Sequence, residues 1–246
     1  MNRTLRIAIT GGTSGLGLAL VAELVGRGAD VAFVARTRAR VEDVARAIPG
    51  TIGIVGDVSR KEDIYPIALQ IVGNLGGLDV LVNNASSLGA TTLKPLADTE
   101  CEEFELALAT NVLGPFRLTK ALLGALAASA REARGGVVVN VTSDAAVSAY
   151  PRWGAYGASK AALDHMSRIW SEELASEGIR VLSLDPGDMD TPLHAIAVPD
   201  ADRSTLKRPE AAAREFADAI RAAVPIGGSG WSGGSGWSEA NVETRA

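Results

Sequence analysis

The sequence predicts an α/β fold, in which a doubly wound parallel sheet is covered by helices on both faces. Short apolar runs alternate with segments of helical periodicity along most of the chain, which is the pattern of βαβ units. The runs are hydrophobic at successive positions, as in strands that are buried on both faces. A glycine-rich turn follows the first run, which is a place where sheets of this class bind ligands.

Right-handed crossovers leave few topologies for such a chain, and the strand order 3-2-1-4-5-6 of the Rossmann type is favoured. Nothing within residues 1–225 marks a boundary, so we expect a single domain there. The expected strands span residues 5–10, 31–35, 51–55, 78–82, 137–141 and 179–184. The expected helices span residues 18–25, 37–48, 61–75, 98–130, 155–177 and 209–224.

Composition and charge narrow the class of protein. Of the 246 residues, 47% are hydrophobic and 22% are charged, which provides for a sizeable core. The net charge of −5 at pH 7 favours neither nucleic acid nor an anionic membrane as a partner. The single cysteine, Cys101, excludes an internal disulfide and suits a reducing compartment. With no signal segment and no membrane-spanning run evident, we expect a cytoplasmic protein.

Gly11, Gly15 and Gly17 lie in the turn between the first expected strand and its helix. Glycines let a backbone turn sharply and approach a pyrophosphate, while the helix N-terminus offers free N–H groups and the positive end of its dipole. The hydroxyls of Thr13 and Ser14 add hydrogen-bond donors. An ordinary turn is the alternative, but the position at the first βα turn favours nucleotide binding.

The residue after the second strand indicates which nucleotide binds. A carboxylate there accepts hydrogen bonds from the ribose 2′-hydroxyl, whereas an arginine can hold a 2′-phosphate. This chain has Arg36, followed by Thr37 and Arg38, and no carboxylate that would repel a phosphate. NADP(H) is therefore favoured over NAD(H), unless these arginines are simply solvated residues at a helix start.

Polar residues also follow the third and fourth strands. Asp57 can accept a hydrogen bond from the adenine amino group, beside Val58 packed on the ring, or it can cap the next helix. Asn84 can tie neighbouring loops together, and the small Ala85 leaves room for a cofactor. A plain polar turn is the alternative for this pair.

Ser143, Tyr156 and Lys160 carry the groups needed to move a proton on and off an oxygen. Tyr156 and Lys160 are four residues apart and share one face of the expected helix, and Ser143 follows the fifth strand. An ammonium about 4 Å from the phenol contributes on the order of 4 kcal/mol, or roughly three units of pKa, before desolvation opposes it. We therefore expect Tyr156 to be the acid and base, with its pKa lowered by Lys160. Taken singly, these residues could be a cap and an amphipathic helix face.

In order and spacing, these motifs resemble those of the classical short-chain dehydrogenase/reductase family, over about residues 5–192. One departure is Ser86, where the family usually has glycine, and its hydroxymethyl group would narrow the site. The residues that carry the resemblance are Thr10-Gly11-Gly12-Thr13-Ser14-Gly15-Leu16-Gly17, Asp57, Asn83-Asn84-Ala85, Asn111, Ser143, Tyr156-Gly157-Ala158-Ser159-Lys160 and Pro186-Gly187-Asp188-Met189-Asp190-Thr191.

The resemblance implies an NADP(H)-dependent oxidoreductase that interconverts a carbonyl and a secondary alcohol by hydride transfer at a Ser-Tyr-Lys-Asn site. In such a site Ser143 orients the substrate oxygen, Lys160 also holds the nicotinamide ribose, and Asn111 holds a water that links Lys160 to solvent. A catalytically idle NADP(H)-binding scaffold or redox sensor is the alternative. The nicotinamide end is expected to be closed by Pro186, Gly187, Met189 and Thr191.

The small-molecule carbonyl or alcohol substrate is expected to contact residues near the same site, but these do not identify it. Tyr150 and Trp153 could form an apolar wall or could pack locally. His194 and His165 lack a partner with metal-ligand spacing, so we predict no metal. A homodimer or homotetramer is the expected assembly. The candidate substrate residues are Asp144, Tyr150, Trp153 and His194.

Residues 226–246 differ in composition from the rest of the chain. They contain a tandem Gly-Gly-Ser-Gly-Trp-Ser sequence, and Gly/Ser-rich segments behave as flexible coil. We predict a flexible tail, which makes a seventh strand doubtful, although family members normally have one. The alternative is that Trp231 and Trp237 dock on a neighbouring subunit.

Overall fold

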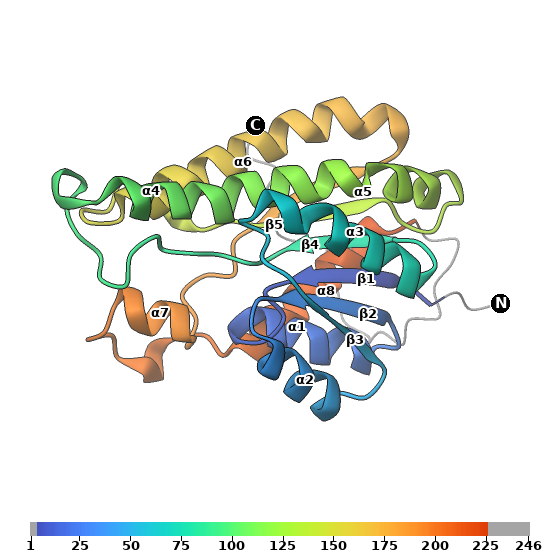
Figure 1. The fold of residues 1–246 in the computed structure, drawn as a ribbon, viewed down its shortest axis with the longest axis horizontal. Coiled ribbons are helices and arrows are strands. Elements are labelled where there is room, and N and C mark those ends of the chain that lie inside the picture. The colour runs from blue at the N-terminus through green and yellow to red at the C-terminus, as the bar shows by residue number, and fades with distance from the viewer. Residues whose placement is uncertain (1–3, 226–246) are drawn as a thin grey trace.

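In the computed structural model, which describes residues 4–225, six parallel strands form one sheet in the order β3-β2-β1-β4-β5-β6 (Figure 1). The predicted fold class and strand order are confirmed. The predictions of a flexible tail and a doubtful seventh strand fall on residues 226–246, outside the described part of the chain. The strands are β1 (Arg6–Thr10), β2 (Asp30–Ala35), β3 (Thr51–Val55), β4 (Val80–Asn83), β5 (Val137–Val141) and β6 (Arg180–Leu184).

Helices cover both faces of the sheet, with α3, α5 and α6 on one face and α1, α2 and α8 on the other (Figure 1). Within residues 4–225, no helix is long and apolar enough to cross a membrane. The helices are α1 (Gly15–Gly26), α2 (Arg38–Ala47), α3 (Lys61–Leu75), α4 (Cys101–Leu108), α5 (Gly114–Arg131), α6 (Gly154–Leu174), α7 (Pro192–Ala197) and α8 (Pro209–Ala223).

Successive side chains of a strand enter different cores. Ile7 and Ile9 of β1 pack with α1, α2 and α8, whereas Ala8 between them packs with α3, α5 and α6. All three are fully buried. This two-sided burial explains why the strands are continuously apolar rather than alternating.

The strand order reverses beside β1, which pairs with both β2 and β4. Ile9 lies opposite Phe33 of β2 on one side and opposite Val82 of β4 on the other. The helices that follow β1 and β4 lie on opposite faces of the sheet, so the two loops diverge at the carboxyl ends of the strands. Ligands bind at such switch points in open α/β sheets.

The helix predicted over residues 98–130 continues without a gap over residues 101–131, but it contains a turn that was not predicted. The chain forms α4, then a π-helical turn at Ala109–Leu113, and then α5. Pro115 has no N–H to donate to the carbonyl of Asn111 four residues earlier, which disturbs the regular α-helical hydrogen bonding at this point. π-helical turns are frequent at functional sites, and this one contains Asn111.

A buried chain of hydrogen bonds fixes α6 against the sheet. Asn83 Nδ2 donates to Asn140 Oδ1 at 2.8 Å, and Asn140 Nδ2 donates to Ser167 Oγ at 2.8 Å. All three side chains are buried. Because an unpaired polar group in the interior is costly, this chain fixes the position of α6, and with it Tyr156, relative to β4 and β5.

Candidate active site

The turn after β1 lies directly against the loop after β4. Asn84 Nδ2 donates to the Thr10 carbonyl oxygen at 2.8 Å, and the Asn84 and Ala85 N–H groups both donate to Thr10 Oγ1 at 3.0 Å. A Cβ on Gly11, whose φ is +73°, would lie 2.9 Å from Asn84 Nδ2. A Cβ on Gly17 would lie 2.2 Å from the Gly11 carbonyl oxygen. Both positions therefore require glycine.

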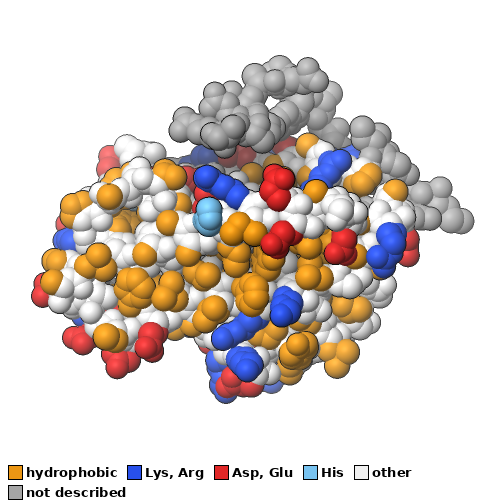
Figure 2. Space-filling model, turned by 90° about the horizontal axis from the view of Figure 1, so that it is seen from above, with side chains coloured by type: hydrophobic (Ala, Val, Ile, Leu, Met, Phe, Trp, Pro, Cys, Tyr) orange, Lys and Arg blue, Asp and Glu red, His pale blue; other side chains and the backbone are white. Residues whose placement is uncertain are grey.

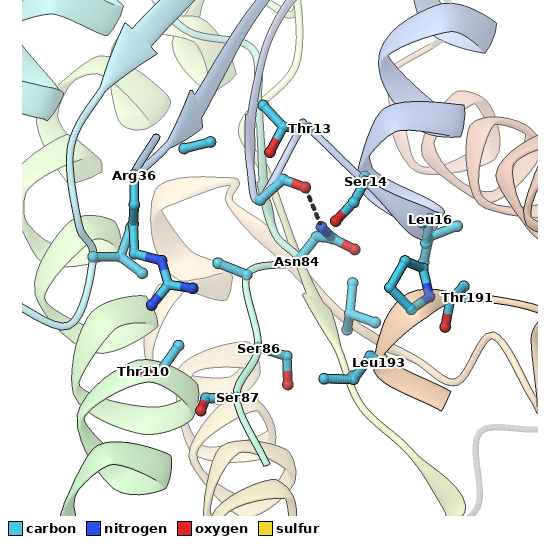
Figure 3. Close-up of a pocket in the computed structure, with 18 of the residues that line it drawn as sticks. Thr13, Ser14, Leu16, Arg36, Asn84, Ser86, Ser87, Thr110, Thr191 and Leu193 are labelled. Atoms are coloured by element: carbon cyan, nitrogen blue, oxygen red, sulfur yellow. Dashed lines mark hydrogen bonds between the residues drawn. The ribbon is translucent and has the colours of Figure 1, made fainter. Parts of the chain in front are cut away.

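A cavity of about 410 Å³, the first cavity, opens beside this turn at the carboxyl ends of the strands (Figure 3). Of the predicted cofactor residues, Gly187 lies elsewhere, on a neighbouring cavity. The others line the first cavity: Gly11, Thr13, Ser14, Gly15, Leu16, Gly17, Arg36, Thr37, Asp57, Val58, Asn84, Ala85, Tyr156, Lys160, Pro186, Met189 and Thr191.

Two arginines line the part of the first cavity next to β2. Figure 3 shows the Arg36 guanidinium extending into the cavity, and Arg40 lines it one helical turn further on. Arg40 was not predicted, although its spacing of four from Arg36 across the start of α2 could have shown it. Arg38 does not line the cavity, and its guanidinium lies 4.0 Å from Glu42.

Asp57 is the single carboxylate lining the first cavity within the described residues. Its Oδ1 accepts hydrogen bonds from the N–H of Ser59 at 2.9 Å and from the Ser59 hydroxyl at 2.7 Å. It does not cap α3, which begins at Lys61. The carboxylate therefore orders the turn between β3 and α3 beside the cavity.

The groups around the first cavity fit a dinucleotide. At the start of α1, Ser14 is extended and, within the described chain, makes no side-chain capping bond; the first turn has no acidic residue. The N–H groups there are left for an anion such as a pyrophosphate. Thr142 Oγ1 is buried without a hydrogen-bond partner among residues 4–225, and Thr142 lines the same cavity.

Tyr156 and Lys160 of α6 reach the first cavity from the far side, and both are buried. Lys160 Nζ donates to the carbonyl oxygen of Val141 at 2.7 Å and lies 5.5 Å from the centre of the Tyr156 ring. The spacing of four residues thus brings a phenol and an ammonium into one site. The end of β5 supplies the ammonium with its acceptor.

Burial dominates the ionisation of both groups. It raises the pKa of Tyr156 to about 12, although hydrogen bonds with Ser143 and Ser86 lower it. It lowers the pKa of Lys160 to about 8, against the attraction of the Asp185 carboxylate. The expectation that Lys160 lowers the pKa of Tyr156 below its ordinary value is therefore wrong for the protein alone, because burial raises this pKa and the opposing contributions come from Ser143 and Ser86.

Ser143 lies at the start of the 3₁₀ turn Asp144–Ala146, directly after β5. Its hydroxyl accepts a hydrogen bond from the Ala145 N–H at 3.2 Å and donates to Asp144 Oδ1 at 3.0 Å. The hydroxyl of Tyr150 donates to the other oxygen of the same carboxylate at 2.7 Å. Ser143 is therefore both a cap and a neighbour of Tyr156, and Asp144 orients its hydroxyl.

The side-chain amide of Asn111 is fully engaged. Its Oδ1 accepts from the Ser87 N–H at 2.8 Å and from Ser86 Oγ at 3.2 Å, and its Nδ2 donates to Ser87 O and to Ser159 Oγ, both at 2.8 Å. Asn111 therefore ties the loop after β4 to α6. Ser86, where the family usually has glycine, takes part in this network. Any water that links Lys160 to solvent would bind elsewhere than on this amide.

A second cavity, of about 500 Å³, shares Tyr156 with the first. The ring of Trp153 lies 5.7 Å from the Tyr156 ring, edge to face. Arg152, with a φ of +75°, places Trp153 there, and its guanidinium donates to Leu93 O at 2.7 and 3.0 Å. All four predicted substrate residues line this second cavity: Asp144, Tyr150, Trp153 and His194.

Two acidic residues of the second cavity were missed from the sequence: Asp185 and Asp188. They lie in the loop after β6, where no periodicity indicates which side chains face inward. Within residues 4–225, no group of three His, Cys, Asp or Glu side chains could hold a metal ion.

The comparisons with known proteins agree with this geometry. A model of the short chain dehydrogenase family matches residues 6–201. The chain belongs to this family. It is accordingly an oxidoreductase acting on alcohol or carbonyl groups.

Characterised and uncharacterised relatives match most of the length of this chain. It is 33% identical over 233 residues to an uncharacterized oxidoreductase of Mycobacterium tuberculosis, covering 90% of this chain and 67% of the relative. It is 32% identical over 187 residues to L-fucose dehydrogenase of Bos taurus, covering 76% of this chain and 67% of the relative.

Two solved structures of similar fold contain nicotinamide cofactors. A 3-ketoacyl-(acyl-carrier-protein) reductase from Brucella melitensis complexed with NADH has a TM-score of 0.82 and 26% identity, covering 89% of this chain and 91% of that one. An alcohol dehydrogenase from Thermococcus sibiricus complexed with 5-hydroxy-NADP has a TM-score of 0.78 and 26% identity, with the same coverage.

Gly17→Ala tests the requirement for a close backbone approach at the first cavity. We expect the variant to bind a nicotinamide dinucleotide at least about tenfold more weakly, because the added methyl meets the Gly11 carbonyl oxygen and the turn must shift. Gly26→Ala, in the same helix with nothing within 4 Å, is the matched control. Fluorescence titration with NADPH and with NADH measures both, and equal affinity of the two variants would contradict the geometry.

Proposed function

We propose that this dehydrogenase is an NADP(H)-dependent carbonyl reductase or alcohol dehydrogenase that works through Ser143, Tyr156 and Lys160. The observation that carries the proposal is the position of Tyr156, which lines both cavities. A phenol between a dinucleotide-sized cleft and a second pocket can reach the oxygen of a substrate whose carbon faces the cofactor.

The proton chemistry belongs to the side chains, while the nicotinamide, when bound, supplies or accepts the hydride. With its pKa raised to about 12 by burial, Tyr156 holds its proton at neutral pH. Tyr156 can therefore donate that proton to a carbonyl oxygen as the carbonyl carbon gains the hydride, and solvent returns a proton to the phenolate. This state of the phenol favours carbonyl reduction.

Lys160 and Ser143 assist this transfer. The ammonium of Lys160 is held by the Val141 carbonyl and shielded from water, so its charge acts strongly on the phenolate that forms when Tyr156 gives up its proton. Ser143 stands beside the phenol, and its hydroxyl would turn from Asp144 to the substrate oxygen. Asn111 holds the loop after β4 against α6 and is a positioning residue.

The preference for NADP(H) rests on Arg36 and Arg40. Both line the first cavity, no ion pair within residues 4–225 involves Arg36, and the single acidic residue of this cavity, Asp57, accepts hydrogen bonds from Ser59. Two guanidinium groups at the end of β2 can bind a ribose 2′-phosphate with charge-assisted hydrogen bonds.

We also propose that copies of the chain associate through the α5 and α6 face. Figure 2, which looks onto this side, shows hydrophobic side chains across the middle of the face. Leu113, Phe116 and Ile169 are exposed there although they are large and apolar. Such a patch marks an interaction surface.

Tyr156→Phe separates an enzyme from an idle binding protein. The change removes the proton but keeps the ring, so we expect kcat for ketone reduction to fall by about 10²–10⁴-fold while the affinity for NADPH is retained. Steady-state kinetics with a panel of ketones and titration with NADPH measure the two quantities. NADPH binding without turnover by the wild type, on any carbonyl or alcohol, would support the scaffold or sensor instead.

Arg36→Ala tests the cofactor preference against a neighbouring arginine. We expect the ratio of kcat/KM for NADPH over NADH to fall at least about tenfold, because a charge-assisted contact with the 2′-phosphate is lost. Arg38→Ala removes the same charge two residues away from a side chain outside the cavity, and should leave the ratio unchanged. An unchanged ratio in Arg36→Ala would contradict the proposed phosphate contact.

A further inference from the structure

The second cavity is strongly acidic. Three carboxylates line it, those of Asp144, Asp185 and Asp188, and no Lys or Arg of residues 4–225 does so. His194 also lines it, and its Nε2 lies 3.8 Å from Asp188 Oδ1. The pocket that adjoins Tyr156 therefore has a net negative charge.

These charges are hydrogen-bonded but not neutralised. Asp144 accepts from two neutral hydroxyls, those of Ser143 and Tyr150. Asp185 Oδ1 accepts from the backbone N–H of Gly187 at 2.8 Å. Neutral donors stabilise a carboxylate without cancelling its field. The Lys160 ammonium attracts Asp185 and offsets part of its charge, so the negative charge left to a ligand comes mainly from Asp144 and Asp188.

Two cationic side chains in the loop before α8 form ion pairs with acidic residues outside the pocket. Arg203 pairs with Asp190 at 2.7 Å, and Lys207 Nζ lies 2.9 Å from Glu215. Neither side chain lines the second cavity, although a Cβ on Gly187, which does line it, would lie 3.9 Å from Lys207 Nζ. The charge of this nearby cation is offset by its pairing with Glu215 rather than by the carboxylates of the pocket.

The field of these carboxylates reaches the reacting group. After burial, which is the main cause, both Asp185 and Asp144 contribute to the raised pKa of Tyr156. The phenol and the carboxylates therefore share one electrostatic environment.

Aromatic rings line the same cavity as these charges. Trp153 lies between Tyr150 and Tyr156, with ring centres 6.3 and 5.7 Å away. Aromatic faces attract cations, and indole does so most strongly. Carboxylates and aromatic rings around one cavity are the combination that recognises an ammonium group.

We propose that the substrate carries a positively charged amino or quaternary ammonium group in addition to its carbonyl or secondary alcohol. The inference rests on the proposed function, since it places the reacting oxygen at Tyr156 and the cation among Asp144, Asp185, Asp188 and Trp153. Substrates with a carboxylate or phosphate in the same position are disfavoured, because no cation lining the pocket would pair with them.

Three ketones that differ only in the charge of one substituent test the proposal. They are 4′-(aminomethyl)acetophenone, which is cationic, 4′-(hydroxymethyl)acetophenone, which is neutral, and 4-acetylbenzoate, which is anionic. With NADPH at low salt, we expect kcat/KM to fall in that order, with at least about tenfold between cation and anion. Added salt should reduce the difference in kcat/KM among the three ketones, because it screens the charges.

Charge-removing variants assign the preference to this pocket. Asp185→Asn keeps the acceptor for Gly187, and Asp188→Asn keeps the shape of an exposed side chain. Each should reduce the cation-to-anion ratio by about two- to fivefold, as expected for one partly screened charge. Asp30→Asn, at the amino end of β2, removes one charge at the end of the strands away from the cavities and should leave the ratio unchanged.

The charge preference can be separated from catalysis. Calorimetry measures the affinity of the Tyr156→Phe variant, in the presence of NADPH, for each of the three ketones. The charge preference can therefore be determined even when no ketone is turned over. Tighter binding of the cation, weakened in Asp188→Asn but not in Asp30→Asn, supports the inference. Equal affinities, or a preference for the neutral or anionic ketone, overturn it, while the proposed function is lost only when no carbonyl or alcohol is turned over by the wild type.

Discussion

The contact between the turn after β1 and the loop after β4 is the constraint on which the site depends. Thr10 and Asn84 hold the two segments together, and the space left between them admits only hydrogen at Gly11 and Gly17. This contact brings the start of α1 to the switch point of the sheet. The first cavity therefore follows from backbone geometry as much as from its polar side chains.

The second requirement is that α6 be fixed to the sheet. The hydrogen bonds from Asn83 through Asn140 to Ser167 hold it, and Lys160 adds a bond from α6 to the end of β5. Burial of Tyr156 and Lys160 has opposite effects on their pKa values: it keeps the phenol protonated and weakens the hold of the ammonium on its proton. The protonated phenol is the state that the proposed delivery of a proton to a substrate oxygen requires.

Much of this could be predicted from the sequence, because strands buried on both faces and glycines after a strand have strong local signals. The fold class, the strand order and the residues of the first cavity follow from such signals. The disturbed hydrogen bonding within the long helix could also have been predicted from Pro115, which cannot donate to Asn111. The pKa of Tyr156 could not, because it depends on how far tertiary packing excludes water. Asp185 and Asp188 were missed for a related reason, since only the folded loop directs them into the second cavity.

Transfer of deuterium tests most directly whether the two cavities meet at one reaction centre. NADPH carrying deuterium at the transferable position of its nicotinamide is incubated with the enzyme and a ketone, and the alcohol is analysed by mass spectrometry and NMR. Hydride transfer beside Tyr156 predicts one deuterium on the carbinol carbon, with a single configuration, and loss of this product in Tyr156→Phe. Consumption of NADPH without deuterium in the alcohol, or equal labelling by Tyr156→Phe, would contradict it.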